Sequence, residues 1–171
     1  EQVGYDMYCR LLDEVVKELK GEEIEEAIDV QIDLNVSSYI PDDFISDSSQ
    51  KIEIYQKIAL CRSEKDIEDV LDEIIDRYGK APDEIQNLLE IARIKNMARE
   101  KAVIKIAQKG NNIIYHFDAN KFGIESIDKL IKIYRSRIKF SPGSVPYITF
   151  NLSEKNKLSI IEQCKEFLNN L

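Results

Sequence analysis

The chain has 171 residues, a hydrophobic content of 43% and a net charge of −8 at pH 7. This composition is typical of one globular domain or two small lobes, and it argues against a disordered tail. No apolar run approaches the ~20 residues that a membrane-spanning helix needs, so we expect a cytoplasmic protein without a membrane partner. The chain starts without Met and shows no signal segment, which favours a fragment of a longer protein.

Cysteine and charge usage narrow the classes of function further. Cys9, Cys61 and Cys164 are far apart and follow no pattern, which argues against a disulfide framework and a metal site. Residues 21–76 carry a net charge of −13, whereas residues 77–171 carry +7. The acidic part is a poor surface for nucleic acid. The basic residues of the second part are scattered and are only a weak indication of nucleic-acid binding.

The first half of the chain alternates between helical and strand patterns. Residues 5–20 have apolar side chains at helical spacing up to Gly21, and an acidic run follows. Residues 29–36 alternate strictly between apolar and polar, which predicts a strand with one buried face. A third segment, capped by Asp47 or Ser48, is expected to be helical to about Arg62.

The most informative stretch, residues 63–97, predicts two helices separated by a tight break. Ser63 and Asp66 resemble a capping box, and Gly79 is suited to end the first helix before Pro82 starts the next. An apolar stripe at the helical period predicts the buried face of the first helix. Its members are Ile67, Val70, Leu71, Ile74, Ile75 and Tyr78.

Three charged residues of the first of these helices form a candidate site. At about 100° per residue, Glu73, Asp76 and Arg77 point roughly away from the apolar stripe. Glu73 and Arg77 are spaced to form an i,i+4 pair. Geometry alone favours an ordinary solvated helix face here, so the residues by themselves do not assign a function.

The second half follows the order β-β-α-β-β-α. Two apolar runs flank Gly110 and Asn111, which predicts a hairpin, and a helix is expected over roughly 123–134. Two more strands flank the turn at 141–144, and a helix ends the chain. We therefore predict an α+β fold: a helix-rich first lobe with one strand pattern, about 22–101, and a β-β-α-β-β-α second lobe, about 102–171. No glycine-rich phosphate-binding motif is present, so we expect no nucleotide cofactor in this chain.

Four segments, in order, resemble the C-terminal part of the bacterial transcription-repair coupling factor family. They are Val3–Leu12, Tyr39–Ile45, Glu73–Gly79 with Pro82, and Leu88–Arg93. The resemblance covers roughly residues 1–105 and identifies residues 1–21 as a helix left from an upstream translocase module. Residues 22–171 would then be the C-terminal regulatory domain, while the remainder matches in element pattern only.

The resemblance implies a non-catalytic, autoinhibitory module. In the family, the whole protein is an ATP-dependent DNA translocase that displaces stalled RNA polymerase and recruits nucleotide excision repair. This domain docks on an excinuclease-B-like module of the same chain and masks the surface that recruits excinuclease A. The family's docking contacts include a Glu-x-x-Asp-Arg motif, which falls on Glu73, Asp76 and Arg77. ATP, RNA polymerase and DNA would then be ligands of the whole protein only.

Two other functions remain open. A nucleic-acid-binding module would use the basic residues between 93 and 109, namely Arg93, Lys95, Arg99, Lys101, Lys105 and Lys109. A small enzyme would need Asp42, Asp43 and His116 in one pocket. We favour a turn for the two aspartates and a surface role for His116, and therefore expect no catalytic residue and no metal site.

Overall fold

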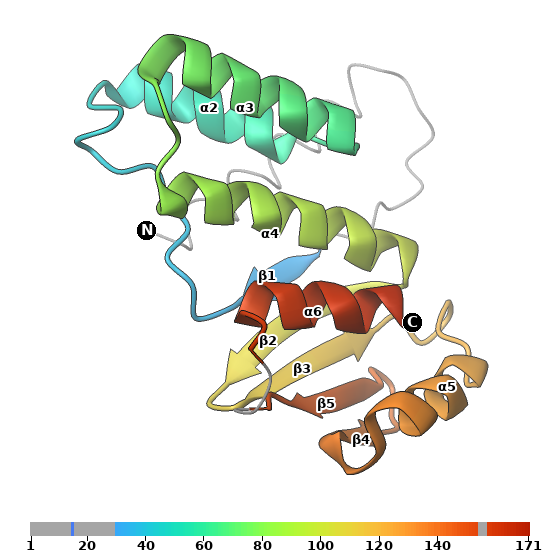
Figure 1. Ribbon diagram of the computed structural model, residues 1–171. Helices are drawn as coiled ribbons and strands as arrows, with labels where there is room; N and C mark the ends of the chain where they lie inside the picture. Colours follow the sequence, from blue (N-terminus) through green and yellow to red (C-terminus); the bar gives the residue numbers. More distant parts are fainter. Residues whose placement is uncertain (1–14, 16–29, 154–156) are drawn as a thin grey trace. The chain divides into compact units, whose positions relative to one another are not determined.

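The computed structural model describes residue 15, residues 30–153 and residues 157–171 (Figure 1). The helix predicted over 5–20 and the acidic run after it lie outside the described residues, apart from Val15, which is helical. The chain divides into two compact units. The described part of the first unit is residue 15 and residues 37–93, and that of the second is 30–36, 94–153 and 157–171.

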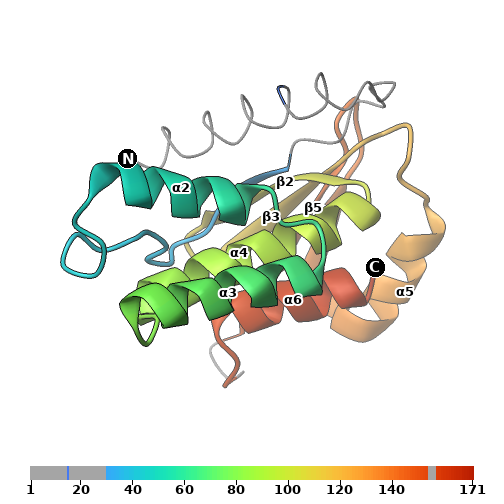
Figure 2. The same ribbon diagram turned by 90° about the horizontal axis from the view of Figure 1, so that it is seen from above.

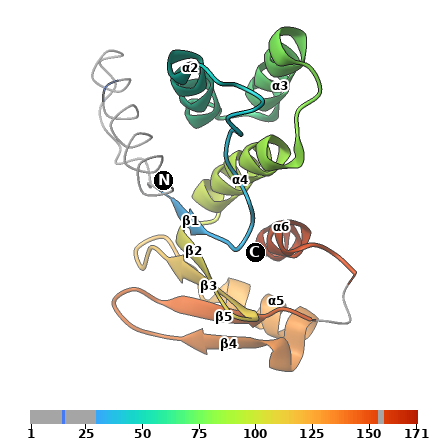
Figure 3. The same cartoon turned by 90° about the vertical axis from the view of Figure 1, so that its left-hand side faces the viewer.

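The first unit is a helical body around one apolar core. Its helices are α2 (Ser48–Ala59), α3 (Glu64–Tyr78) and the first part of α4 (Asp83–Glu100), whose residues from Ile94 onward belong to the second unit. Figures 2 and 3 show α2 and α3 side by side. The fully buried side chains at their centre include Ile54 of α2, Ile74 of α3 and Leu89 of α4. The apolar stripes predicted from the sequence therefore form this core.

The ends of α3 follow from local sequence. Ser63 and Asp66 form the predicted capping box: the Ser63 side chain accepts from the Asp66 N–H, and the Asp66 carboxylate accepts from the Ser63 N–H. Gly79 ends the helix with a φ of 95°, a conformation that L side chains rarely adopt. One member of the stripe differs from prediction, because Ile75 lies at its edge and is 45% exposed.

The second unit is built on a five-stranded sheet with the order β1-β2-β3-β5-β4. Its strands are β1 (Gln31–Asp33), β2 (Val103–Lys109), β3 (Asn112–Phe117), β4 (Ile138–Ser141) and β5 (Tyr147–Asn151). The predicted Gly110 hairpin joins β2 to β3, and all pairs are antiparallel except β1 with β2. The fold is thus α+β, with the predicted β-β-α-β-β-α order from residue 103 onward.

One face of this sheet is covered by helices α5 (Glu125–Tyr134) and α6 (Ile160–Asn169), which Figure 3 shows on the same side of the strands. Phe167 of α6 stacks on Tyr115 of β3, with ring centroids 4.0 Å apart. Tyr134 of α5 contacts both Phe150 of β5 and Phe167. A short 3₁₀ helix, Arg135–Arg137, connects α5 to β4. Aromatic packing thus holds α5 and α6 on the same face.

The division into units differs from the predicted lobes in two respects, the first of which is the boundary within α4, which falls after Arg93 and not at about residue 101. The strand at 29–36 was expected in the first lobe, but β1 pairs in parallel with β2, as in the register Ile32 with Ile106. A strand must find a partner for its backbone N–H and C=O groups, and the hairpin of the second unit offers one. Within the described ranges, every helix is too short or too polar to cross a bilayer.

The capping box yields a stability prediction. Ser63→Ala removes the acceptor for the Asp66 N–H at the start of α3 and should destabilise the protein by about 1 kcal/mol. Urea unfolding followed by circular dichroism measures this change. Ser46→Ala, at an exposed serine before α2, is the control and should be close to neutral. Equal stabilities for the two variants would show that the cap contributes nothing.

Candidate functional site

The three predicted site residues lie along the second half of α3. Because Ile67, Val70 and Ile74 face the core, neighbouring positions on either side of this stripe reach the helix surface. Glu73 and Arg77 flank the stripe on the side facing α2, and their side chains are 32% and 33% exposed. Asp76 is exposed. The three residues therefore share one helix, but they do not all point away from the core as predicted.

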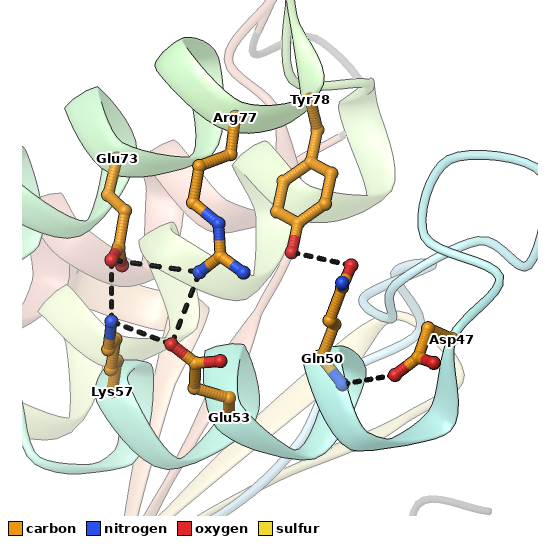
Figure 4. Close-up of polar contacts among 7 residues, drawn as sticks. All are labelled: Asp47, Gln50, Glu53, Lys57, Glu73, Arg77 and Tyr78. Atoms are coloured by element: carbon orange, nitrogen blue, oxygen red, sulfur yellow. Dashed lines mark hydrogen bonds and ion pairs between the residues drawn. The ribbon is translucent and has the colours of Figure 1, made fainter.

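Glu73 and Arg77 belong to a four-residue cluster with Glu53 and Lys57 of α2, which we call the α2–α3 charge cluster (Figure 4). Lys57 Nζ lies 2.5 Å from Glu73 Oε1 and 3.0 Å from Glu53 Oε1. Arg77 Nη1 lies 3.2 Å from Glu53 Oε1 and 3.7 Å from Glu73 Oε1. Two acids and two bases thus alternate around a closed ring, in which each base contacts both acids.

Aromatic and amide contacts extend this arrangement toward the end of α3. The Arg77 guanidinium lies over the Tyr78 ring, 5.0 Å from its centroid. The Tyr78 hydroxyl donates to Gln50 Oε1 at 3.0 Å, and Gln50 N–H donates to Asp47, the cap of α2 (Figure 4). The planar guanidinium is suited to such combined stacking and ion pairing. The Arg77 side chain is consequently restrained by contacts with Glu53, Glu73 and Tyr78.

Hydrogen bonds within the cluster shift the pKa values of Glu53 and Lys57 in opposite directions. The hydrogen bonds donated first by Lys57 and then by Arg77 lower the pKa of Glu53. The hydrogen bonds to Glu73 and then Glu53 raise the pKa of Lys57. Both shifts favour the charged forms of Glu53 and Lys57.

Asp76 is the exception among the three predicted residues. Its side chain forms no hydrogen bond or ion pair with another residue in the described part of the chain. The surface of α3 thus combines an exposed carboxylate at Asp76 with the balanced charges of Glu73 and Arg77. An arrangement of this kind is suited to recognising a polar, basic partner surface, because Asp76 gives up no contact with the described residues when a partner binds.

The residues considered for an enzyme lie in different units. Pro41–Ile45 is a turn in which the Pro41 carbonyl accepts from the N–H groups of Phe44 and Ile45, and Asp42 pairs with Lys51. His116 lies on β3 in the other unit, beside Tyr147 with ring centroids 5.6 Å apart. Burial, followed by the charges of Lys105 and Lys109, lowers the pKa of His116. Within the described ranges, no group of three His, Cys, Asp or Glu side chains is arranged to hold a metal ion.

The predicted basic surface at residues 93–109 is divided. The Arg93 side chain is only 19% exposed, and it donates to Glu64 and Glu90 within the first unit. Arg99 donates to Asn96 at 2.7 Å. Lys105 and Lys109 lie on β2, two residues on either side of Ala107, and are exposed. The six bases therefore do not form one continuous helix face.

Sequence reasoning missed Glu53 and Lys57. Their i,i+4 spacing on the predicted helix was a visible signal for an ion pair. Their contacts with Glu73 and Arg77 depend on which helices pack together and on the offset of the two helices along their axes. The periodicity of the sequence contains no such information. The ring across two helices could therefore be seen only in three dimensions.

Comparison with known proteins places this fold in a family. The model of the TRCF domain matches residues 34–124, slightly more than half of the chain. A transcription-repair-coupling factor of Staphylococcus haemolyticus is 38% identical over 115 residues, or 66% of this chain and 10% of that protein. The corresponding protein of Rickettsia prowazekii is 30% identical over 165 residues, or 95% of this chain and 15% of that protein.

A solved structure agrees with these relatives. The crystal structure of a C-terminal domain of transcription-repair coupling factor has a TM-score of 0.70 and 27% identity, covering 82% of this chain and 90% of that one. The chain spans only about a tenth of the length of the first curated relatives that it matches.

The α2–α3 charge cluster yields a prediction on pH and salt. Glu53→Gln should lower the free energy of unfolding at pH 7, because Lys57 and Arg77 then lose one charged acceptor. Since the pKa of Glu53 is lowered in the folded state, its contribution is complete above the usual carboxylate pKa and disappears as the pH falls through the lowered value. The difference between the two proteins should also shrink in high salt.

Glu68→Gln is the matched control, since Glu68 is exposed on α3 and makes the same change of charge. Urea unfolding from pH 2 to pH 8 measures both variants. A Glu53→Gln effect that persisted unchanged at the lowest pH would contradict an ionic origin.

Proposed function

Because the chain belongs to the transcription-repair coupling factor family, we propose that it is a non-catalytic regulatory domain of such a factor, acting by docking on another part of the same protein. We propose further that the docking partner is the excinuclease-B-like module of the full-length protein. In the docked state the domain would cover the surface that recruits excinuclease A. The full-length protein, in this proposal, is an ATP-dependent DNA translocase of transcription-coupled nucleotide excision repair.

One observation carries the proposal. Asp76 is exposed and has no partner among the described residues, whereas Glu73 and Arg77, on the same helix, are held by α2 in a fixed arrangement. These are the three residues of the motif that contributes docking contacts in the family. Side chains already fixed in place lose little conformational entropy when a partner binds, so a polar contact becomes more favourable.

The expected strength of docking is consistent with regulation. Contacts between domains of one chain are typically polar and bury about 600–1,500 Å². Covalent attachment raises the effective concentration of the partner surface, so a contact that would be weak between separate molecules can hold the closed form. A competing interaction that favours the open form by a few kcal/mol then releases the domain. Binding of RNA polymerase, or movement of the motor on DNA, would be such interactions.

Asp76→Arg in the full-length protein tests this function. The reversal leaves the α2–α3 charge cluster intact and places a positive charge where the docked partner is expected to meet a carboxylate. We expect higher basal ATPase activity and tighter binding of excinuclease A, with unchanged thermal unfolding of the isolated chain. Asp128→Arg, the same reversal at an exposed position of α5, is the control and should behave like the unaltered protein.

Replacing Glu73, Asp76 and Arg77 together with Ala should have at least the same effect on recruitment. Ordinary ATPase activity and recruitment in both variants would refute docking through α3.

A further inference from the structure

The sheet of the second unit has a second face, opposite the one covered by α5 and α6. Side chains alternate along each strand, so the register determines which residues share this face. We call it the open sheet face because neither α5 nor α6 lies on it, and its central rows are Lys105–His116–Tyr147 and Ala107–Ile114–Thr149. Lys139 of β4 continues the second row, and Lys109, Asn112 and Asn151 form a third.

Positive charge predominates among the described residues of the open sheet face. Lys105, Lys109 and Lys139 are exposed, and His116, Tyr147 and Thr149 are half-buried. The acidic residue that the described strands place on this face is Asp33, which lies on the edge strand β1 beside Ala107 and three strands away from Tyr147. The excess of lysines over acids on this face agrees with the net charge of +7 that residues 77–171 carry.

Aromatic rings lie among these lysines. The His116 and Tyr147 rings are neighbours on adjacent strands, with centroids 5.6 Å apart and planes inclined by 41°. Burial, and then the charges of Lys105 and Lys109, lower the pKa of His116 and so favour the neutral imidazole. Neutral aromatic rings surrounded by cations on a sheet are a general platform for single-stranded nucleic acid, in which bases stack and phosphates meet lysine.

We propose that the open sheet face binds single-stranded nucleic acid, with a base stacked at the Tyr147–His116 pair and phosphates contacted by Lys105, Lys109 and Lys139. Asn112 and Asn151, which are hydrogen-bonded to each other at 3.0 Å, border the face with further polar groups. This surface belongs to the second unit, whereas α3 belongs to the first, and the proposal does not depend on the docking proposed above. It differs from the set of basic residues between 93 and 109 that the sequence suggested, because Arg93 and Arg99 take no part in it.

Binding of a fluorescein-labelled oligothymidine to the 171-residue chain, followed by fluorescence anisotropy over a range of salt concentrations, tests the proposal. Tyr147→Ala should weaken binding about tenfold, since stacking on one aromatic side chain is worth on the order of one such factor. Tyr147→Phe keeps the ring and should bind within about twofold of the unaltered chain. Thermal unfolding of both variants shows whether the sheet is intact.

The salt dependence of binding tests the contribution of the lysines. Lys105→Gln combined with Lys109→Gln should reduce the slope of log K against log salt by about 1.4, or ~0.7 for each phosphate that is no longer neutralised. Lys129→Gln combined with Lys132→Gln, on exposed positions of α5, makes the same change of charge and should leave the slope unaltered. The His116 imidazole resonances should also shift when the oligothymidine is added.

Four results would overturn the proposal. The first is no binding of oligothymidine at low salt, and the second is an equal decrease of slope in the two lysine pairs. The third is binding of polyglutamate without binding of oligothymidine, which would assign the face to an acidic protein segment instead. Retained affinity in Tyr147→Ala with an intact sheet would likewise exclude a stacked base.

Discussion

The burial of one apolar stripe of α3 against its neighbours determines the geometry of the candidate docking surface. Ile67, Val70 and Ile74 are buried, and each fully buried aliphatic side chain contributes about 1.5–3 kcal/mol. This packing sets the rotation of α3 about its axis and hence the direction of every other side chain on it. Glu73 and Arg77 consequently face α2, where Glu53 and Lys57 are within reach.

The α2–α3 charge cluster has a different physical role from the core. Exposed ion pairs contribute little to stability, because water and salt screen them and long side chains lose freedom when they pair. Four alternating charges in one ring nevertheless restrict each other's rotamers, and the stacking of Arg77 on Tyr78 adds a further restraint. The cluster is therefore better understood as a device for positioning charge than as a source of stability.

Much of the local structure was predictable, because it depends on neighbouring residues. The Ser63–Asp66 cap, the break at Gly79 and the turn at Gly110 are dictated by a few side chains and by backbone conformation. Relations between distant segments were not predictable from the same information. Two such relations are the parallel pairing of β1 with β2 and the contact of Lys57 with Glu73, and both depend on which surfaces meet. The alternation at 29–36 predicts a strand but not the strand with which it pairs.

The place of β1 in the sheet has a consequence for the order of assembly. Its alignment with β2 requires two segments far apart along the chain to meet, as in the bond from Asn35 N–H to Gln108, which are 73 residues apart. Closing so long a loop is entropically costly, and the residues between include the whole helical body of the first unit. If those helices condense early, the ends of the intervening chain are brought closer before the pairing forms. The β2–β3 hairpin, with its short local turn, then offers a ready template, and the arrival of β1 becomes a late step of folding.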